Sequence, residues 1–448
     1  MSSRRPPAEC PAGSPKRDYL EPEDGITDVP KVTPLARLNH RERTQGLLVI
    51  LVDTFLMWGG FFMVIPLISV HYVNELGWAA ASVGLVLAVR QLTQQGLAFI
   101  GGVLADRLGA KGLICTGLFV RGIGFVAMAW ASTLPLLLLT ATLAALGGAM
   151  FEAPKAAAIR ALTEEAERAR FYALSGVVSG LGLTVGPLVG ALLLRLDFAL
   201  VALVAGGCFF VTGLVTLVGL PSVTLATERG SLTHGLRLAL RDRPFVTFTV
   251  ILMGYYFMWA QLVISFPLAA TEIAGTPDAV SWVYGLNAGM AIVLQYPLLR
   301  LAERWLRPLP ILILGIGIMA LGLAGVALTS TIAGLLLCVA AFSIGSLLAS
   351  PSQQTVTASL ANPAALGSYF GVGALSIAIG GGLGNYAGGL LYGFGERMEA
   401  PALPWLVFSF VGIVAACGMW AMDRQQISRR PRSLTEPVPA SRRSAGSR

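Results

Sequence analysis

Three charged residues of this sequence lie inside long apolar runs, where a charge is rare. They are Asp53, Arg90 and Arg121. A charge at the centre of a lipid bilayer costs about 2.5–3.5 kcal/mol even on the mildest scale, so each of these side chains is expected to face a partner or a water-filled passage. A carboxyl group in such a passage can carry a proton, and a nearby guanidinium group can change how tightly it does so. The pattern therefore indicates proton coupling, with Asp53 as the first candidate.

Other interpretations of these charges stay open. A static ion pair between Asp53 and one of the arginines, Arg90 or Arg121, would explain them without proton movement. Glu152 is a second candidate carboxylate for proton coupling, and its place just before Pro154 also suits a residue that holds a loop.

A polar stripe follows Arg90, because Gln91, Gln94 and Gln95 share its side of a helix. The stripe would suit a water-lined cavity between helices, or packing against another helix. Aromatic rings near such a cavity favour hydrophobic or cationic substrates. The candidate residues of a substrate cavity are Trp58, Phe62, Gln91, Gln94, Gln95, Tyr255, Tyr256 and Trp259.

The composition indicates the elements that position these residues. Of the 448 residues, 55% are hydrophobic and only 12% are charged, whereas soluble domains carry about 25% charged residues. Apolar runs long enough for a membrane helix of ~20 residues recur along the chain. We therefore expect an all-α membrane protein with twelve transmembrane helices. They lie near 46–72, 80–104, 112–131, 134–151, 171–194, 198–219, 247–270, 282–301, 311–329, 332–350, 370–393 and 404–422.

Basic residues predict the orientation of these helices. The net charge is +8, and most of the 32 Lys and Arg residues fall in alternate loops and in the two tails. Loops rich in Lys and Arg face the cytoplasm. The prediction is a multi-pass protein of the cell (inner) membrane with both termini in the cytoplasm. Charge placed in this way does not indicate a nucleic-acid partner.

The chain divides into two related halves. Met57-Trp58 recurs as Met258-Trp259 at a shift of about 201 residues, and at a shift of about 197 Gly148 pairs with Gly345. We expect two pseudo-symmetric six-helix bundles. The predicted parts are a disordered cytoplasmic tail (1–45), an N-terminal bundle (46–220), a cytoplasmic linker (221–246), a C-terminal bundle (247–422) and a cytoplasmic tail (423–448).

Two glycine-containing motifs stand out. The first is Gly102-x-x-x-Asp106-Arg107-x-Gly109-Ala110-Lys111, in which Gly109 allows a tight turn between two helices and the charges can form ion pairs that latch one face. The second is Gly182-x-x-x-Gly186-Pro187-x-x-Gly190, whose glycines give a flat helix face that admits a close neighbour. Pro187 can kink that helix.

These motifs resemble two signatures of the major facilitator superfamily, and the resemblance extends from about residue 46 to 422. It implies the major facilitator fold, with the first motif as a cytoplasmic gate loop and the second as an antiporter-type helix. It also implies a monomer that carries small molecules across the lipid bilayer, with a proton gradient as the energy source and no cofactor. Such antiporters often carry an arginine in span four. Because this chain has no basic residue there before Lys155, the resemblance leaves that role to Arg90 or Arg121.

The function expected from these observations is proton-coupled efflux of small hydrophobic or cationic compounds by alternating access. The alternative is an uptake symporter for an organic anion, with Arg90 and Arg121 as counter-charges. An enzyme is not expected, because the sequence has no metal-type cluster of His, Asp and Glu, no GxSxG and no P-loop.

Overall fold

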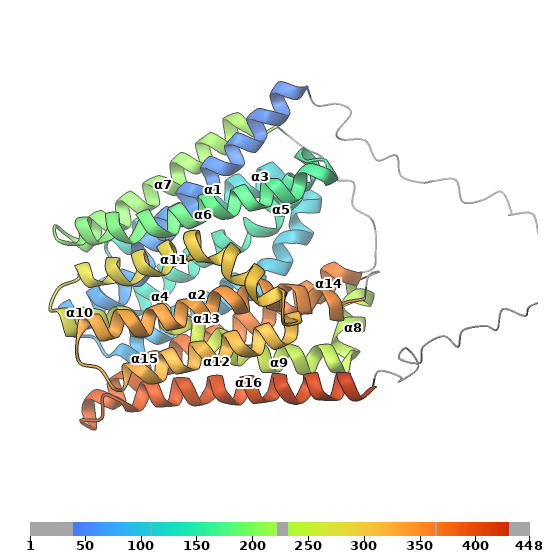
Figure 1. Ribbon diagram of the computed structural model, residues 1–448. Helices are drawn as coiled ribbons and strands as arrows, with labels where there is room; N and C mark the ends of the chain where they lie inside the picture. The colour runs from blue at the N-terminus through green and yellow to red at the C-terminus, as the bar shows by residue number, and fades with distance from the viewer. Residues whose placement is uncertain (1–38, 109, 222–231, 363–364, 430–448) are drawn as a thin grey trace, which may run out of the picture. The chain divides into compact units, whose positions relative to one another are not determined.

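A computed structural model describes residues 39–108, 110–221, 232–362 and 365–429, and every regular element in these ranges is helical (Figure 1). The helices of the first half are α1 (His40–Ser69), η2 (Val70–Glu75), α2 (Ala80–Leu108), α3 (Ala110–Met128), α4 (Leu134–Ala149), α5 (Glu152–Leu162), α6 (Glu165–Leu194) and α7 (Phe198–Gly219). The remaining helices are α8 (Leu232–Arg241), α9 (Arg243–Trp259), η3 (Ala260–Leu262), α10 (Ser265–Ala274), α11 (Asp278–Glu303), α12 (Pro308–Val326), α13 (Ile332–Leu360), α14 (Leu366–Leu375), η5 (Ser376–Gly380), α15 (Gly381–Arg397) and α16 (Leu403–Arg429).

Several helix ends follow from capping residues. The Glu42 side chain accepts a hydrogen bond from the Asn39 backbone N–H at 3.0 Å and closes a capping box at the start of α1. Asp197 caps α7 and Asp242 caps α9, each by accepting a backbone N–H of the first turn. α10 ends at Gly275, whose φ of 66° is left-handed and suits glycine.

Ten helical segments of the described chain are long and apolar enough to cross a membrane. Two of the twelve expected spans, 80–104 and 282–301, form the long helices α2 and α11, which are not among the ten. Arg90 and its three glutamines lower the mean hydropathy of α2, and polar residues such as Asn287 do so in α11. The fold is therefore that of a multi-helix membrane protein, as expected, with ten rather than twelve spans evident from length and apolarity.

The helix boundaries differ from the sequence predictions at several places, and the expected span 370–393, for example, is divided into α14, η5 and α15. α1 begins at His40 rather than near residue 46, and the expected linker 221–246 contains α8 and the start of α9. The fourth expected span is broken at Met150 and Phe151, after which α5 continues to Leu162. The seventh is divided into α9, the short η3 and α10. The predictions of disorder concern mainly residues 1–38 and 430–448, which lie outside the described residues.

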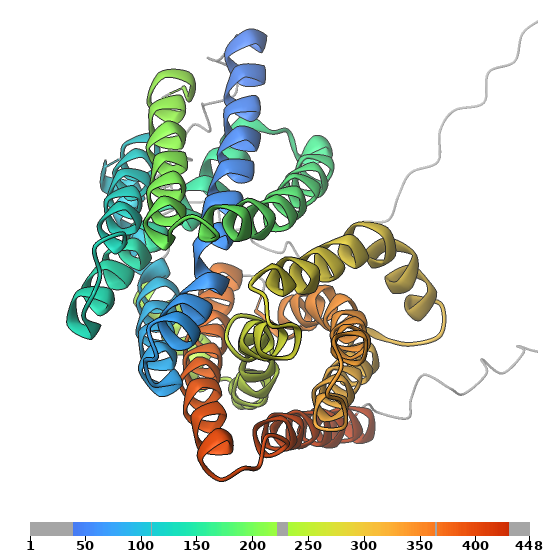
Figure 2. The same ribbon diagram turned by 90° about the vertical axis from the view of Figure 1, so that its left-hand side faces the viewer.

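α1 begins and α16 ends on the same side of the molecule (Figure 1). Helices of the first half meet the second half mainly through two pairs, α2 with α15 and α6 with α11 (Figure 2). The α2–α15 contact is close, since a Cβ atom at Gly84 would lie 2.6 Å from the Asn385 carbonyl oxygen. The Ser281 hydroxyl donates to the Pro187 carbonyl at 3.2 Å across the α6–α11 contact.

One backbone contact occurs twice, once in each half. In α3 and α4, a Cβ at Gly117 would lie 2.7 Å from the Gly147 carbonyl oxygen. In α12 and α13, a Cβ at Gly315 would lie 2.6 Å from the Gly345 carbonyl oxygen. Both contacts need glycine for the same reason, which supports the repeat seen in the sequence. By these contacts, Gly345 of the second half is equivalent to Gly147 of the first half. The sequence repeat predicts Gly148, one residue further on.

Candidate functional site

Asp53 lies on the inner side of α1 and is only 2% exposed. Its Oδ2 accepts a hydrogen bond from the Thr216 hydroxyl of α7 at 2.6 Å, and its Oδ1 has no hydrogen-bond partner among the described residues. Among the described residues, no arginine lies within ion-pair distance of Asp53. This conformation therefore does not contain the static Asp–Arg pair. The free Oδ1 is a place where a proton can be held.

Lys155 of α5 is a residue that the sequence interpretation did not include among the site candidates. Its side chain is buried, its Nζ lies 5.4 Å from the centre of the Phe151 ring, and its charge interacts with those of Asp53 and Glu152. A lysine in an apolar helix segment was the available signal, but Lys155 falls after the predicted end of span four. The structure thus buries a basic residue after the break in the fourth span, where its charge acts on the candidate carboxylate.

Arg90 lies in α2 and is 4% exposed. Its Nη2 donates to the Gln91 Oε1 at 2.9 Å and its Nη1 to the Gln94 Oε1 at 3.1 Å, so two of the glutamines predicted to form a polar stripe hold the guanidinium group. Gln95 is half-buried on the same helix. Gln91 also packs against Gly381 of α15, which brings this cluster to the contact between the two halves.

Arg121 lies in α3 and is 3% exposed. Its guanidinium carbon lies 4.8 Å from the centre of the Phe61 ring and 5.1 Å from that of Phe209. The same Phe61 ring lies 5.0 Å from the guanidinium carbon of Arg90, so one aromatic ring contacts both cations. Gly148 leaves room for Arg121, because a Cβ at that position would overlap its guanidinium group. Sequence reasoning identified both arginines but not their shared ring.

Glu152, the second candidate carboxylate, is exposed in the first turn of α5 and forms no ion pair among the described residues. Its charge acts on Arg121 and Lys155 from a distance. Of the four proton-coupling candidates, Asp53, Arg90 and Arg121 are therefore enclosed by protein and Glu152 is not.

The predicted cavity aromatics fall into two groups. Trp58 stacks on Phe62 with ring centres 5.6 Å apart, and Phe62 reaches Tyr284 of the second half at 5.8 Å. Tyr255 packs edge to face against Tyr256 at 4.8 Å. Phe62 and Tyr255 are each 2% exposed and serve as core, whereas the more accessible candidates are Trp58, Tyr256 and Trp259.

The glycine motif of α6 faces α1. A Cβ at Gly182 would lie 2.8 Å from the Phe55 carbonyl oxygen, and one at Gly186 would lie 2.5 Å from that of Gly59. Gly190 continues this close approach beside Met63. Pro187 does not end the helix, which runs on to Leu194. The motif therefore holds α6 against the helix that carries Asp53.

The predicted gate loop is short, because α2 runs to Leu108 and α3 begins at Ala110. Gly109 lies outside the described residues, as do the side chains of Asp106 and Arg107. Gly102 falls within α2, and Lys111 is the second residue of α3 and is half-buried.

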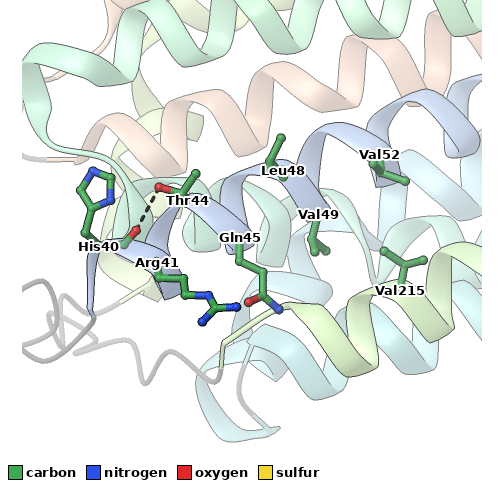
Figure 3. A pocket seen from close by; sticks show the side chains of 8 residues that line it. All are labelled: His40, Arg41, Thr44, Gln45, Leu48, Val49, Val52 and Val215. Atoms are coloured by element: carbon green, nitrogen blue, oxygen red, sulfur yellow. Dashed lines mark hydrogen bonds between the residues drawn. The ribbon is translucent and has the colours of Figure 1, made fainter.

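Two of the cavities of the described chain lie away from these residues. An open groove of about 530 Å³ runs along α1 and α7 past Leu48, Val52 and Val215 (Figure 3). A cavity of about 460 Å³ lies between α10, α15 and α16, where the Tyr392 hydroxyl donates to Glu272. Neither contains the buried charges, so neither is the substrate cavity that the sequence predicts.

An exposed ion pair joins the two halves. Arg195, just after α6, donates two hydrogen bonds to Asp278 at the start of α11, one of them from Nε at 3.1 Å. These bonds and the carboxylate charge raise the pKa of Arg195 above its ordinary value. A cation whose pKa is raised in the folded state adds stability at every pH below the pKa it has in the unfolded chain. Arg195 therefore stays charged between pH 5 and 9, and its part of the ion pair does not depend on pH in that range.

We expect the variant Arg195→Glu to open the α6–α11 contact, because it places two carboxylates opposite each other. Distances between spin labels at Leu196 and Thr276 would lengthen or broaden. The double variant Arg195→Glu with Asp278→Arg restores the opposite charges and is expected to restore the distances. If the double variant behaves like the single one, the ion pair does not hold this contact.

Ten apolar helical segments of the described chain, with charged side chains buried between helices, are the features of a multi-pass membrane protein, and comparison with known proteins identifies its class as that of the membrane transporters. The sequence matches the Major Facilitator Superfamily over residues 50–384 and 248–446, and the chain belongs to that family. It is 39% identical to the multidrug resistance protein MdtH of Proteus mirabilis (strain HI4320) over 383 residues, which are 86% of this chain and 95% of that protein. It is also 39% identical to MdtH of Yersinia enterocolitica over 391 residues, 87% of this chain and 98% of the relative.

Solved structures of transporters share the fold. A bacterial homolog of the human lysosomal transporter Spinster, in an inward-facing and occupied conformation, superimposes with a TM-score of 0.71 at 15% identity, covering 87% of this chain and 99% of that one. A POT family transporter in complex with 5-aminolevulinic acid gives a TM-score of 0.69 at 13% identity, covering 85% and 96%. At such low identity the likeness concerns the fold alone.

Proposed function

We propose that this chain is a proton-coupled exporter of small hydrophobic compounds that works by alternating access. The observation that carries the proposal is the 39% identity, over 86% of the chain, to proteins named multidrug resistance protein MdtH. The buried Asp53, with one oxygen bonded to Thr216 and the other free, supplies a group that can take up and release a proton. Transport needs no cofactor in this proposal, because the proton gradient supplies the energy.

The proposed architecture is twelve membrane helices in two pseudo-symmetric bundles of six. In this proposal α2 and α11 also cross the membrane and bring the ten apolar spans to twelve. A helix with polar residues can cross when neighbouring helices cover its polar face. The repeated glycine contact, Gly117 with Gly147 and Gly315 with Gly345, supports the relation between the bundles. α1 begins and α16 ends on the same side, which supports an even number of crossings. The proposal further places both termini in the cytoplasm of a bacterial cell and the chain in the inner membrane as a monomer.

Coupling would arise from the charges around Asp53. When Asp53 is ionised, the charge of Lys155 is balanced partly by it and partly by Glu152. When Asp53 takes a proton, that attraction is lost, and Lys155 with α5 is free to shift at the break in span four, Met150–Phe151. Arg90 and Arg121 act on substrate rather than on Asp53 in this proposal. The α6 glycines keep α1 and α6 together as a unit during the movement.

The proposal is tested with everted membrane vesicles from cells that produce the chain, in which respiration acidifies the interior. A panel of hydrophobic aromatic dyes, some of them neutral and some with a carboxylate or a cationic group, is added, and at least one dye is expected to accumulate in these vesicles but not in vesicles from cells without the chain. A protonophore should abolish the accumulation. Accumulation that persists after the pH gradient has been dissipated would exclude proton coupling.

The second candidate is an uptake symporter for an organic anion. The positive charges of Arg90 and Arg121, whose Nε atoms have no hydrogen-bond partner among the described residues, favour an anion over a cation beside them. The direction of transport separates the two candidates. Cells lacking the protein accumulate more substrate if it is an exporter and less if it is an uptake system.

A further inference from the structure

Arg90 and Arg121 form a buried pair of cations with few hydrogen-bond partners. A guanidinium group has five N–H donors. Arg90 uses two of them, toward Gln91 and Gln94, and its Nε has no partner. Within the described chain, Arg121 donates no hydrogen bond, and its Nε is also buried without a partner. Buried N–H donors normally have an acceptor. The two Nε donors are therefore missing an acceptor that a buried donor would be expected to have.

The charge of the pair is also unbalanced. No carboxylate lies within 4.0 Å of either guanidinium group among the described residues, and the charge of Arg121 acts unfavourably on Arg90. The nearest acidic influence on Arg121 is the exposed Glu152. Apart from the two glutamine bonds of Arg90, the contacts that stabilise the cations are with aromatic rings, chiefly Phe61, and a ring contact does not use the N–H donors. An anion would supply the missing acceptors and would balance the excess positive charge.

The position of the pair suits a group that arrives between the two halves. Arg90 lies about ten residues into α2, which at ~1.5 Å per residue places it near the middle of the membrane. Transporters of this architecture bind substrate at that depth, where their repeats meet. Gln91, which holds Arg90, touches Gly381 of the second half, and the half-buried rings of Trp58 and Phe61 lie on the adjacent helix α1.

We propose that Arg90 and Arg121 form the binding site for a carboxylate group on the transported substrate, with Phe61 and Trp58 receiving its aromatic or apolar body. This inference rests on the proposed transport function and defines its substrate class as anionic or zwitterionic amphiphiles. A carboxylate fits because its two oxygens match the planar donor pairs of a guanidinium group. Gln94 and Gln91 orient Arg90 for this contact.

The test is equilibrium binding to the purified full chain in detergent, without any gradient. The probes are 1-pyrenebutyrate, which is an anion, and 1-pyrenebutanol, which has nearly the same body and no charge. The anion is expected to bind at least about tenfold more tightly, as hydrogen bonds to a charged group allow. Arg90→Gln and Arg121→Gln are each expected to remove most of that preference without weakening the alcohol.

The matched control is Arg160→Gln, which removes an exposed arginine of α5 and should leave the preference unchanged. If a glutamine variant does not fold, Arg90→Lys and Arg121→Lys keep the charge but lose the paired donors, and the preference should fall by a smaller factor. Equal binding of acid and alcohol by the unaltered chain would overturn the proposal, as would a preference that the folded variants retain. Because binding is measured without transport, a protein that binds the anion in this way but moves no substrate with a proton gradient would contradict the proposed function alone.

Discussion

Replacing Asp53 by Asn is expected to reduce proton-driven export at least about tenfold, the range of a typical coupling energy. Asparagine keeps the size of the side chain and can still accept the hydrogen bond from Thr216, but it cannot bind and release a proton at the free oxygen. The measurement is the initial rate of dye accumulation in everted vesicles. Exchange of labelled for unlabelled substrate without a gradient should remain, because substrate binding does not need the proton.

Asp197→Asn is the matched control for this prediction. It makes the same chemical change at an exposed residue that caps α7 outside the buried cluster. Its transport rate should stay close to that of the unaltered chain. If Asp53→Asn retains full gradient-driven transport, Asp53 has no part in coupling, and Glu152 becomes the candidate to examine next.

Replacing Gly186 by Val is expected to destabilise the protein by about 1–3 kcal/mol or more, the usual cost of overpacking. The added Cβ would lie 2.5 Å from the Gly59 carbonyl oxygen and 3.1 Å from the Met63 N, and both are backbone atoms that cannot rotate away. α6 would have to move from α1, which also carries Asp53. The apparent melting temperature of the purified protein should fall, together with transport.

Gly176→Val tests whether the effect comes from this contact or from adding a branched residue to α6. Gly176 lies on the same helix, and a Cβ there would have no neighbour within 4 Å. The change in helix propensity is the same at both positions. Equal melting temperatures for the two variants would show that close approach of α6 to α1 does not contribute to stability.

The apolar runs predicted the fold well because burial in lipid leaves few alternatives to helices. They did not predict where a helix breaks inside the membrane. Span four is broken at Met150–Phe151, and its continuation α5 buries Lys155, whose charge acts on Asp53. Hydropathy alone ends that span at the first charged residues and predicts a loop position for Lys155. The sequence repeat likewise pairs Gly345 with Gly148 instead of Gly147, because the sequence does not show which of two adjacent glycines faces the neighbouring helix.

The candidate site was predictable in its residue types but not in its pairing. Asp53, Arg90 and Arg121 stood out because charges in apolar runs are rare, and the structure buries all three. Their partners could not be deduced, because Thr216 lies 163 residues from Asp53 and Phe61 is one of many aromatic residues. An ion pair with Asp53 was the simplest expectation for the arginines. In the structure Asp53 instead accepts a hydrogen bond from Thr216, and the two arginines lie against the same Phe61 ring.

The central claim, exchange of substrate for protons, is tested most directly by proton movement that a substrate gradient drives. Liposomes containing the purified chain and a trapped pH-sensitive dye are prepared with equal pH on both sides, and an exported dye identified in vesicles is added outside. Antiport predicts that the interior becomes more alkaline as substrate enters and protons leave, and that Asp53→Asn abolishes the change. An interior that becomes more acidic would indicate symport, and substrate entry without any pH change would contradict proton coupling.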